Sequence, residues 1–281
     1  MSGKQYSLHP FFLDGLKGKL FCLSFLPSDA VNNNRSVLIV PPFAEEMNKS
    51  RRMLSLQGRR LAEAGFTVLL PDLYGTGDSE GEFGDASWDC WLDDLNRAWA
   101  WFENKEIENI SILTLRSGSL LVSDLMARFS PKVNSLVLWQ PVVSGAVFLT
   151  QFLRLKLAAE MSKSSKDKIT VNELKQLLVD GSSIEVAGYM VSPEMASGLE
   201  WSMLDIKPGN IVNNIFWYEI VSDESRSLPV VNQKVIESLS ASGVALSVSK
   251  LKGAPFWLAS EIVDVSRLLD LTLTALMSKD S

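Results

Sequence analysis

Short apolar runs that alternate with amphipathic helical patterns constrain this sequence more than any other feature. The apolar runs have the length and residue types of buried strands, and they lie at 20–26, 36–40, 67–70, 110–115, 135–139, 215–221 and 244–249. Helical patterns occur between several of them, at 48–64, at 87–104 and from about 119 to 129. This alternation predicts an α/β fold, in which a mostly parallel central sheet carries helices on both faces.

The region between Gly145 and Leu204 interrupts the alternation. It contains Thr170 and Glu173 at the spacing of a helix capping box, and Ser192-Pro193 is typical of the start of another helix. A helical segment inserted between two strands of a sheet is typical of a cap or lid. We therefore expect residues 1–144 and 205–281 to form the core and residues 145–204 to form a helical cap.

Composition and charge exclude several classes of function. The chain has 281 residues, 46% of them hydrophobic and 21% charged, which is enough apolar material for one large core. The net charge is −6 and the basic residues are scattered, so we expect no binding to nucleic acid. No segment resembles a signal peptide or approaches the roughly 18 apolar residues of a membrane span. We expect a soluble, cytoplasmic protein without membrane insertion, and the sequence leaves its oligomeric state open.

Cysteine and histidine are scarce. Cys22 and Cys90 are the only cysteines, and both lie among apolar neighbours, as buried structural thiols do. We expect neither a metal nor another cofactor. The single histidine is His9, which precedes the first expected strand and should lie far from the opposite edge of the sheet.

Four loops follow expected strands at the sheet edge where open α/β proteins bind ligands. They contain the segments 40–46, 72–79 (DLYGTGDS), 114–118 and 222–224. Their order and spacing resemble those of the α/β-hydrolase superfamily. More specifically, the chain resembles the second of the hydrolase-like families found beside the exosortase A system, in bacteria that make exopolysaccharide and sort proteins with a PEP-type C-terminal anchor. The matching segments are 41–53 (PPFAEEMNKSRRM), 139–141 with 151–155, 187–189 and 253–257.

The resemblance implies an α/β-hydrolase fold with a site built from these loops. An early loop would supply an oxyanion-hole N–H near Phe43 or Ala44, and Asp223 would take the position of the catalytic acid. A histidine would follow in the loop after the last strand. That loop has Pro255 or Phe256 where the histidine is expected, so the triad lacks its base.

The segment 112–121 (ILTLRSGSLL) would form the sharp strand-turn-helix that holds the nucleophile. The positions two before and two after a nucleophile must be small, because the turn brings them against neighbouring backbone. With Ser117 or Ser119 as nucleophile, a leucine would occupy one of these positions. Thr114 and Gly118 instead flank Arg116, so we place Arg116 at the nucleophile position. Its guanidinium stays protonated and cannot attack a carbonyl carbon.

A degenerate triad with an arginine at a helix N-terminus favours binding of an anion. We therefore predict a pocket for an anionic small molecule or partner, or for an acyl or ester ligand. Arg116 could also be paired internally with Glu45, Glu46 or Asp223, because an unpaired buried charge is costly.

Two alternatives stay open. The first is a non-standard carboxylic-ester or thioester hydrolase in which Ser117 or Ser119 attacks and Asp223, or one of the pair Glu45 and Glu46, serves as base.

The second alternative is a non-enzymatic interaction module. It would present the tryptophans of the 87–104 helix, although their helical spacing favours a place in the core. These are Trp88, Trp91 and Trp99.

Overall fold

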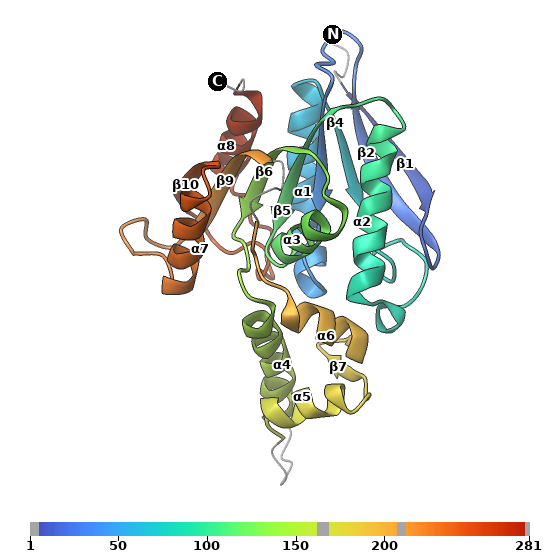
Figure 1. Cartoon of the computed structure of the whole chain (residues 1–281), viewed down its shortest axis with the longest axis vertical. Helices are drawn as coiled ribbons and strands as arrows, with labels where there is room; N and C mark the ends of the chain where they lie inside the picture. The colour runs from blue at the N-terminus through green and yellow to red at the C-terminus, as the bar shows by residue number, and fades with distance from the viewer. Residues whose placement is uncertain (1–5, 162–168, 207–211, 279–281) are drawn as a thin grey trace.

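An eight-stranded sheet forms the centre of the computed structural model, which describes residues 6–161, 169–206 and 212–278 (Figure 1). The strand order is β1-β2-β4-β3-β5-β6-β9-β10. The first two strands pair antiparallel with their neighbours, and all pairs from β4 to β10 are parallel. The predicted α/β fold with a mostly parallel sheet is therefore confirmed. The strands are β1 (Tyr6–Asp14), β2 (Lys19–Pro27), β3 (Arg35–Val40), β4 (Phe66–Pro71), β5 (Asn109–Leu115), β6 (Val133–Trp139), β9 (Val212–Val221) and β10 (Ala245–Lys252).

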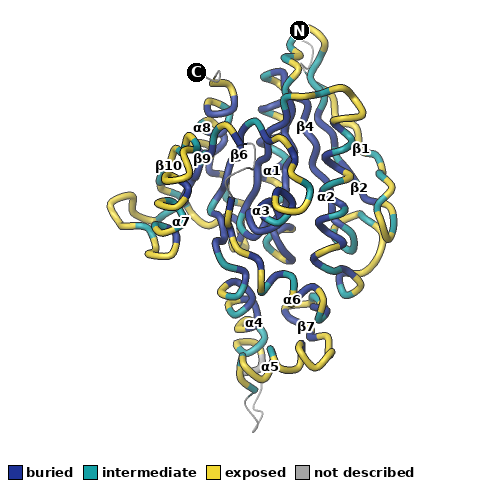
Figure 2. Tube along the Cα trace, in the orientation of Figure 1, coloured by how far each residue is buried: buried dark blue, intermediate teal, exposed yellow. Residues whose placement is uncertain are grey.

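Helices cover both faces of the sheet and bury two separate cores. Alternate residues of a strand point to opposite faces. In β3, Leu38 and Val40 accordingly belong to one buried cluster, and Val37 and Ile39 belong to the other. The first cluster includes residues of α2 (Trp88–Glu103), α3 (Gly118–Phe129) and α7 (Val230–Ala241); the second includes residues of α1 (Glu45–Glu63) and α8 (Ser266–Met277). Figure 2 shows the central strands as the most continuously buried part of the trace.

The chain leaves the sheet between β6 and β9 and forms a group of smaller elements. They lie at the end of the molecule opposite the two chain termini (Figure 1). The elements are α4 (Gly145–Met161), α5 (Val171–Val179), β7 (Ile184–Val186), β8 (Tyr189–Val191) and α6 (Pro193–Trp201). Helices alone were expected here, and the β7–β8 hairpin was missed because three-residue strands are too short to show a period. Its turn is built by Ala187 and Gly188, which both have positive φ.

The N-terminal strand β1 was also missed from the sequence. Most of its residues are exposed, so the apolar run that identifies a buried strand is absent. The expectation that His9 precedes the first strand is wrong, because His9 lies within β1 and pairs with Ser24 of β2. β1 is an edge strand, separated from β5 by three strands in the sheet order.

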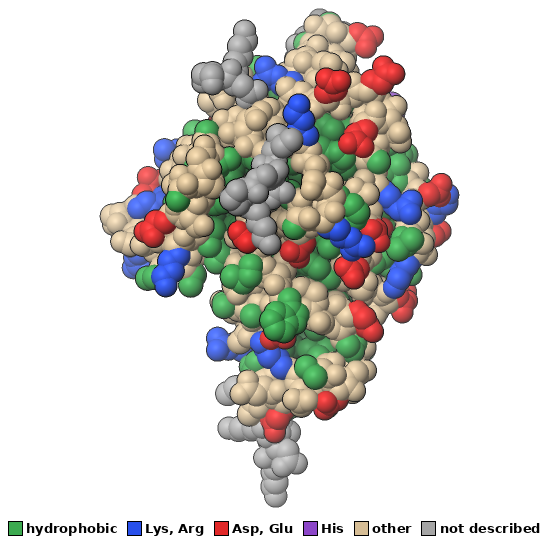
Figure 3. Space-filling model, in the orientation of Figure 1, with side chains coloured by type: hydrophobic (Ala, Val, Ile, Leu, Met, Phe, Trp, Pro, Cys, Tyr) green, Lys and Arg blue, Asp and Glu red, His purple; other side chains and the backbone are tan. Residues whose placement is uncertain are grey.

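The tryptophans of α2 lie in the core. Trp88, Trp91 and Trp99 are each exposed by at most 4%, and Trp91 packs against Phe43 and Phe83. This burial leaves the interaction-module hypothesis without the surface it requires. On the face drawn in Figure 3, acidic and basic side chains are interspersed.

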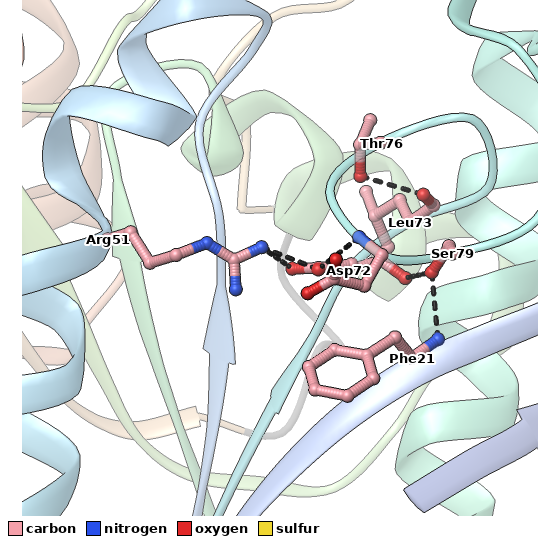
Figure 4. A network of polar contacts seen from close by, with 7 residues as sticks. Phe21, Arg51, Asp72, Leu73, Thr76 and Ser79 are labelled. Atoms are coloured by element: carbon pink, nitrogen blue, oxygen red, sulfur yellow. Dashed lines mark hydrogen bonds and ion pairs between the residues drawn. The ribbon is translucent and has the colours of Figure 1, made fainter. Parts of the chain in front are cut away.

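A polar network after β4 anchors helix α1 to the sheet (Figure 4). The guanidinium of Arg51 in α1 donates to both carboxylate oxygens of Asp72. The same carboxylate accepts the backbone N–H of Asp78, and a Cβ at Gly77 would lie 2.0 Å from it. Ser79 donates to the carbonyl of Asp72 at 2.7 Å. The 72–79 segment is thus a tight structural turn, and it fixes the helix that carries part of the candidate site.

Candidate functional site

Arg116 occupies the tip of a sharp turn between β5 and α3. Its φ is +53°, a left-handed conformation that is uncommon for a residue other than glycine. Its backbone N–H donates to the carbonyl of Trp139 at 3.0 Å, and its carbonyl accepts the N–H of Val142 at 3.1 Å. The turn is therefore held by the segment after β6 as well as by its own strand and helix.

The space around the turn explains its small residues. A Cβ added to Gly118 would lie 2.3 Å from Oγ1 of Thr114 and 2.9 Å from the carbonyl oxygen of Val40. Larger side chains are excluded at this position, as the size argument from sequence requires. The backbone geometry thus places Arg116 at the apex of the turn, with Thr114 and Gly118 packed against each other beneath it.

Ser117 lies beside the apex, but its hydroxyl is buried. The residue is 1% exposed, and its Oγ accepts the backbone N–H of Phe43 at 2.9 Å. Phe43 is where the resemblance implies an oxyanion-hole donor. Because an N–H group carries a single proton, this donor is occupied by Ser117. Ala44, the other candidate donor, is buried and has a φ of +51° directly before α1.

Ser119 has a structural place in the turn. It is fully buried, and its hydroxyl lies 2.7 Å from the carbonyl oxygen of Arg116 and 2.6 Å from that of Val142. Both hydroxyls of the hydrolase hypothesis, those of Ser117 and Ser119, therefore bind backbone groups.

The side chain of Arg116 forms an ion pair with Glu46. Its Nε lies 3.2 and 3.3 Å from the two carboxylate oxygens of Glu46, and its Nη2 lies 3.1 Å from Oε1. The two side chains are 18% and 13% exposed. The guanidinium also lies near two aromatic rings, 5.4 Å from the centroid of Trp257 and 5.9 Å from that of Phe148. Of the three carboxylates expected as partners, the structure brings Glu46 to the arginine.

The positive charge of Arg116 influences the pKa values of two carboxylates that have little contact with solvent. Burial raises the pKa of Glu46, and the neighbouring guanidinium opposes this shift. Burial also raises the pKa of Glu219 in β9, against the effect of Arg116 and of hydrogen bonds from Trp217, Asn232 and Gln140. Glu219 was not anticipated from sequence, because a lone glutamate inside a strand carries no motif.

The late loop presents a different residue from the one expected. Pro255 is exposed, and Phe256 is buried against Trp139 with ring centroids 6.3 Å apart. Trp257 is the residue whose ring faces Arg116. Pro255 or Phe256 at the position of the missing histidine stays a prediction; the side chain of this loop that lies against Arg116 is that of Trp257.

The side chain of Asp223 contacts Ser225 rather than the serines of the elbow. Its carboxylate is exposed and accepts both the N–H and the hydroxyl of Ser225. The N–H bond from Ser225 is the main cause that holds the pKa of Asp223 below its ordinary value, which makes it a weaker base. A contact of Asp223 with Ser117, which Asp223 would need to act directly as the base, is not among the contacts of the described residues.

A pocket of about 520 Å³ opens beside Arg116. Aromatic and aliphatic side chains form most of its wall, and charged side chains cluster on α1 and at the elbow. The lining residues are Phe43, Glu45, Glu46, Lys49, Arg116, Phe148, Gln151, Phe152, Leu155, Ala187, Trp257 and Leu258. Phe148, Phe152 and Ala187 come from the inserted elements, so core and insertion both form the pocket.

The first turns of α1 supply three charged residues to the pocket. The phenol of Tyr189 donates a hydrogen bond to Oε2 of Glu45 at 3.1 Å. The same phenol oxygen accepts a hydrogen bond from Nδ2 of Asn48 at 2.7 Å. Lys49 donates to the backbone carbonyl of Leu258 at 3.2 Å. Lys49 was overlooked as a site residue, although it lies in the 41–53 segment and follows Glu45 and Glu46 at helical spacing.

The described residues contain no group of three or more His, Cys, Asp and Glu side chains placed to hold a metal ion. Within the same residues, none of the helices combines the length and the apolar character that crossing a bilayer requires.

The chain belongs to the α/β hydrolases, in the family described as serine aminopeptidase S33. The model of this family matches residues 32–201, which is more than half of the chain. No curated protein matches the sequence significantly.

Solved structures share the fold over nearly the whole chain. Hypothetical protein PA2218 from Pseudomonas aeruginosa is 13% identical with a TM-score of 0.60, and the match covers 98% of this chain and 95% of that one. Est1E from Butyrivibrio proteoclasticus, solved with ferulic acid bound, is 15% identical with a TM-score of 0.58, covering 95% and 96%. A thioesterase domain from the curacin biosynthetic pathway is 13% identical with a TM-score of 0.53, covering 97% and 100%. At these identities the likeness concerns the fold, and the site must be judged from its own residues.

Proposed function

We propose that this α/β-hydrolase-fold protein binds a small anionic molecule in the pocket beside Arg116 and has lost serine-triad hydrolysis. The observation that carries the proposal is the position of Arg116 at the apex of the nucleophile turn, with its guanidinium directed to a carboxylate inside the pocket. A guanidinium flanked by aromatic rings in a partly water-excluded pocket is suited to a planar anionic group. The inserted elements between 145 and 204 would act as the cap over this ligand.

The chemistry of the elbow supports binding over acyl transfer. A serine nucleophile needs a general base within hydrogen-bond reach and a free donor for the oxyanion. Ser117 instead accepts the N–H of Phe43, and the late-loop side chain that lies against Arg116 is Trp257, which cannot act as a base. Loss of triad members typically removes several orders of magnitude of rate.

Titration with simple anions tests the binding proposal. Calorimetric titration of the protein with acetate, octanoate, glucuronate and inorganic phosphate should show an anion that binds with a dissociation constant near or below about 1 mM. Arg116→Gln, which keeps a polar but uncharged and shorter side chain, should abolish this binding while the thermal unfolding midpoint shows that the variant is folded. Absence of binding by every anion would overturn the proposal.

Ester hydrolysis tests the competing function. The family model and the esterase-like neighbours are the observations in favour of a hydrolase. We expect p-nitrophenyl butyrate turnover at the level of an unrelated protein, and no labelling by a fluorophosphonate probe. Labelling that disappears in Ser117→Ala or Ser119→Ala would establish a serine hydrolase and refute the loss of hydrolytic function.

The resemblance of the 41–53 segment extends the proposal to the setting in which the protein works. We place it in the cytoplasm of a bacterium with an exosortase system, in exopolysaccharide or protein-sorting physiology. The two buried free thiols, Cys22 and Cys90, suit a reducing compartment. Cell fractionation, and exopolysaccharide yield after gene deletion, test this setting independently of the ligand.

A further inference from the structure

We propose that the ligand is a monocarboxylate with an apolar acyl or aryl body, whose carboxylate replaces that of Glu46 on Arg116 while Glu46 moves to Lys49. The inference rests on the proposed function and narrows it from any anion to one chemical class. It also assigns a role to Lys49.

The contact between Glu46 and Arg116 shows which group the pocket accepts. Both carboxylate oxygens of Glu46 lie within 3.3 Å of Nε, and Nη2 lies 3.1 Å from Oε1. Trp257 and Phe148 flank the guanidinium. A carboxylate from a ligand can reproduce these contacts, since it has the same two oxygens in one plane. A phosphate would bring additional oxygens that lose hydration in a pocket whose wall is mostly apolar.

Lys49 provides a second partner for the displaced Glu46. It lies three residues after Glu46 on α1, a spacing that places both side chains on one face of the helix. Both line the same pocket, and the Lys49 ammonium now donates to the neutral carbonyl of Leu258. A buried carboxylate without a cation is costly. Transfer to Lys49 would keep Glu46 paired when a ligand takes its place on Arg116.

The pocket wall defines the rest of the ligand. Beyond the charged cluster, the wall is apolar except for Gln151, and its large apolar members are Phe43, Phe148, Phe152, Leu155, Trp257 and Leu258. A buried hydroxyl without a partner costs on the order of 1–3 kcal/mol. A sugar carries several hydroxyls, so this wall disfavours a glycan or a sugar phosphate. An acyl chain or an aromatic ring would gain from burial against the same surface.

Calorimetry with matched ligands and variants tests the inference on the full chain. Octanoate should bind wild-type protein at least roughly tenfold more tightly than octanamide, which lacks the charge-assisted contact. It should also bind at least roughly tenfold more tightly than glucuronate or phosphate, which lack an apolar body to bury against the pocket wall. Glu46→Gln should bind octanoate roughly tenfold more tightly than wild type, since an amide competes weakly for the guanidinium. Glu63→Gln is the matched control, because Glu63 is an exposed glutamate at the far end of the same helix and outside the pocket lining, and it should leave the affinity unchanged.

A double-mutant cycle of Lys49 and Glu46 tests the proposed role of Lys49. Lys49→Met should weaken octanoate binding in the wild-type background and have little effect once Glu46→Gln is present, because no displaced carboxylate then needs the ammonium. Equal losses in both backgrounds would overturn the exchange. Preferred binding of glucuronate or phosphate would overturn the ligand class while leaving the proposed function in place. Failure of all anions to bind, in wild type and in Glu46→Gln, would remove the proposed function itself.

Discussion

Two buried carboxylates in this molecule have different partners. Glu46 lies against the guanidinium of Arg116, whereas Asp94 in α2 is fully buried and forms no ion pair within the described residues. One oxygen of Asp94 accepts the backbone N–H of Tyr74 at 2.9 Å, and the other has no partner within the described residues. Burial is the main cause that raises the pKa of Asp94 to about 6. Its charged form therefore destabilises the folded state.

We expect Asp94→Asn to change the pH dependence of stability. Because the folded pKa is raised, the contribution of Asp94 to stability is fully present below about pH 4 and is lost as pH rises through about 6. A shift of about two units corresponds to roughly 3 kcal/mol. The stability of the variant relative to wild type should thus improve by about 2–3 kcal/mol between pH 4 and pH 7.5.

Urea unfolding at the two pH values measures this change. Asp93→Asn is the matched control, since its carboxylate lies on the adjacent residue, is more exposed and faces Arg128. Parallel pH profiles for wild type and Asp94→Asn would contradict the expectation.

The strand-turn-helix from β5 to α3 depends on close packing at its base. Thr114 and Gly118 are in contact there, and Oγ1 of Thr114 has no hydrogen-bond partner among the described residues. A methyl group at Gly118 would overlap this oxygen and approach the carbonyls of Val40 and Pro41. The backbone conformation that places Arg116 at the apex therefore depends on Thr114 and Gly118, which do not line the pocket.

We expect Gly118→Ala to destabilise the protein by about 2–3 kcal/mol, because overpacking here must move backbone. Thr114→Ala removes the nearest atom, so the double variant should recover part of the loss. Denaturant unfolding of the two single variants and the double variant measures this coupling. Additive effects would show that the clash is not with Thr114.

At the scale of the whole molecule, hydrogen bonds join the inserted elements to the core. The phenol of Tyr189 in β8 accepts Asn48 and donates to Glu45, both on α1. A second hydrogen bond between the inserted elements and the core runs from the hydroxyl of Ser192 to the carbonyl oxygen of Ala86, at 2.9 Å. Burial is the main cause that raises the pKa of Tyr189 to about 12, so the phenol remains a donor at neutral pH.

We expect Tyr189→Phe to loosen the β7–β8 hairpin without unfolding the sheet. Amide hydrogen exchange in residues 184–191 should become faster, while exchange in β3, β5 and β6 stays at the wild-type rate. Asn48→Ala removes a partner of the same phenol and should give a smaller change in the same residues. Unchanged exchange of the hairpin in Tyr189→Phe would show that apolar packing alone, such as that of Tyr189 on Phe83, holds it in place.

Local patterns in the sequence were sufficient for the fold class, the buried strands of the sheet and several of its covering helices. Buried strands appear as apolar runs, and the size limit at 114 and 118 follows from the geometry of any such turn. Patterns failed where the local signal is weak, as in the exposed strand β1 and the short hairpin strands. The same reasoning predicts a ligand site at the carboxyl ends of the strands. Phe43, Glu45, Glu46 and Arg116 line one pocket there and Ala44 and Ser117 do not, while ligand binding at this pocket stays a prediction.

The sequence by itself determined the fold class and the arginine at the apex, because both follow from residue size and hydrophobic period over a few neighbouring positions. Only the tertiary structure decided that Glu46 pairs with Arg116, that Trp257 faces it and that Lys49 shares the pocket. These contacts join side chains that are 70 and 141 residues apart for Arg116. The rotation of a helix and the path of a loop decide which of several carboxylates or aromatic rings contacts a given cation. Neither of them produces a periodic pattern in the sequence.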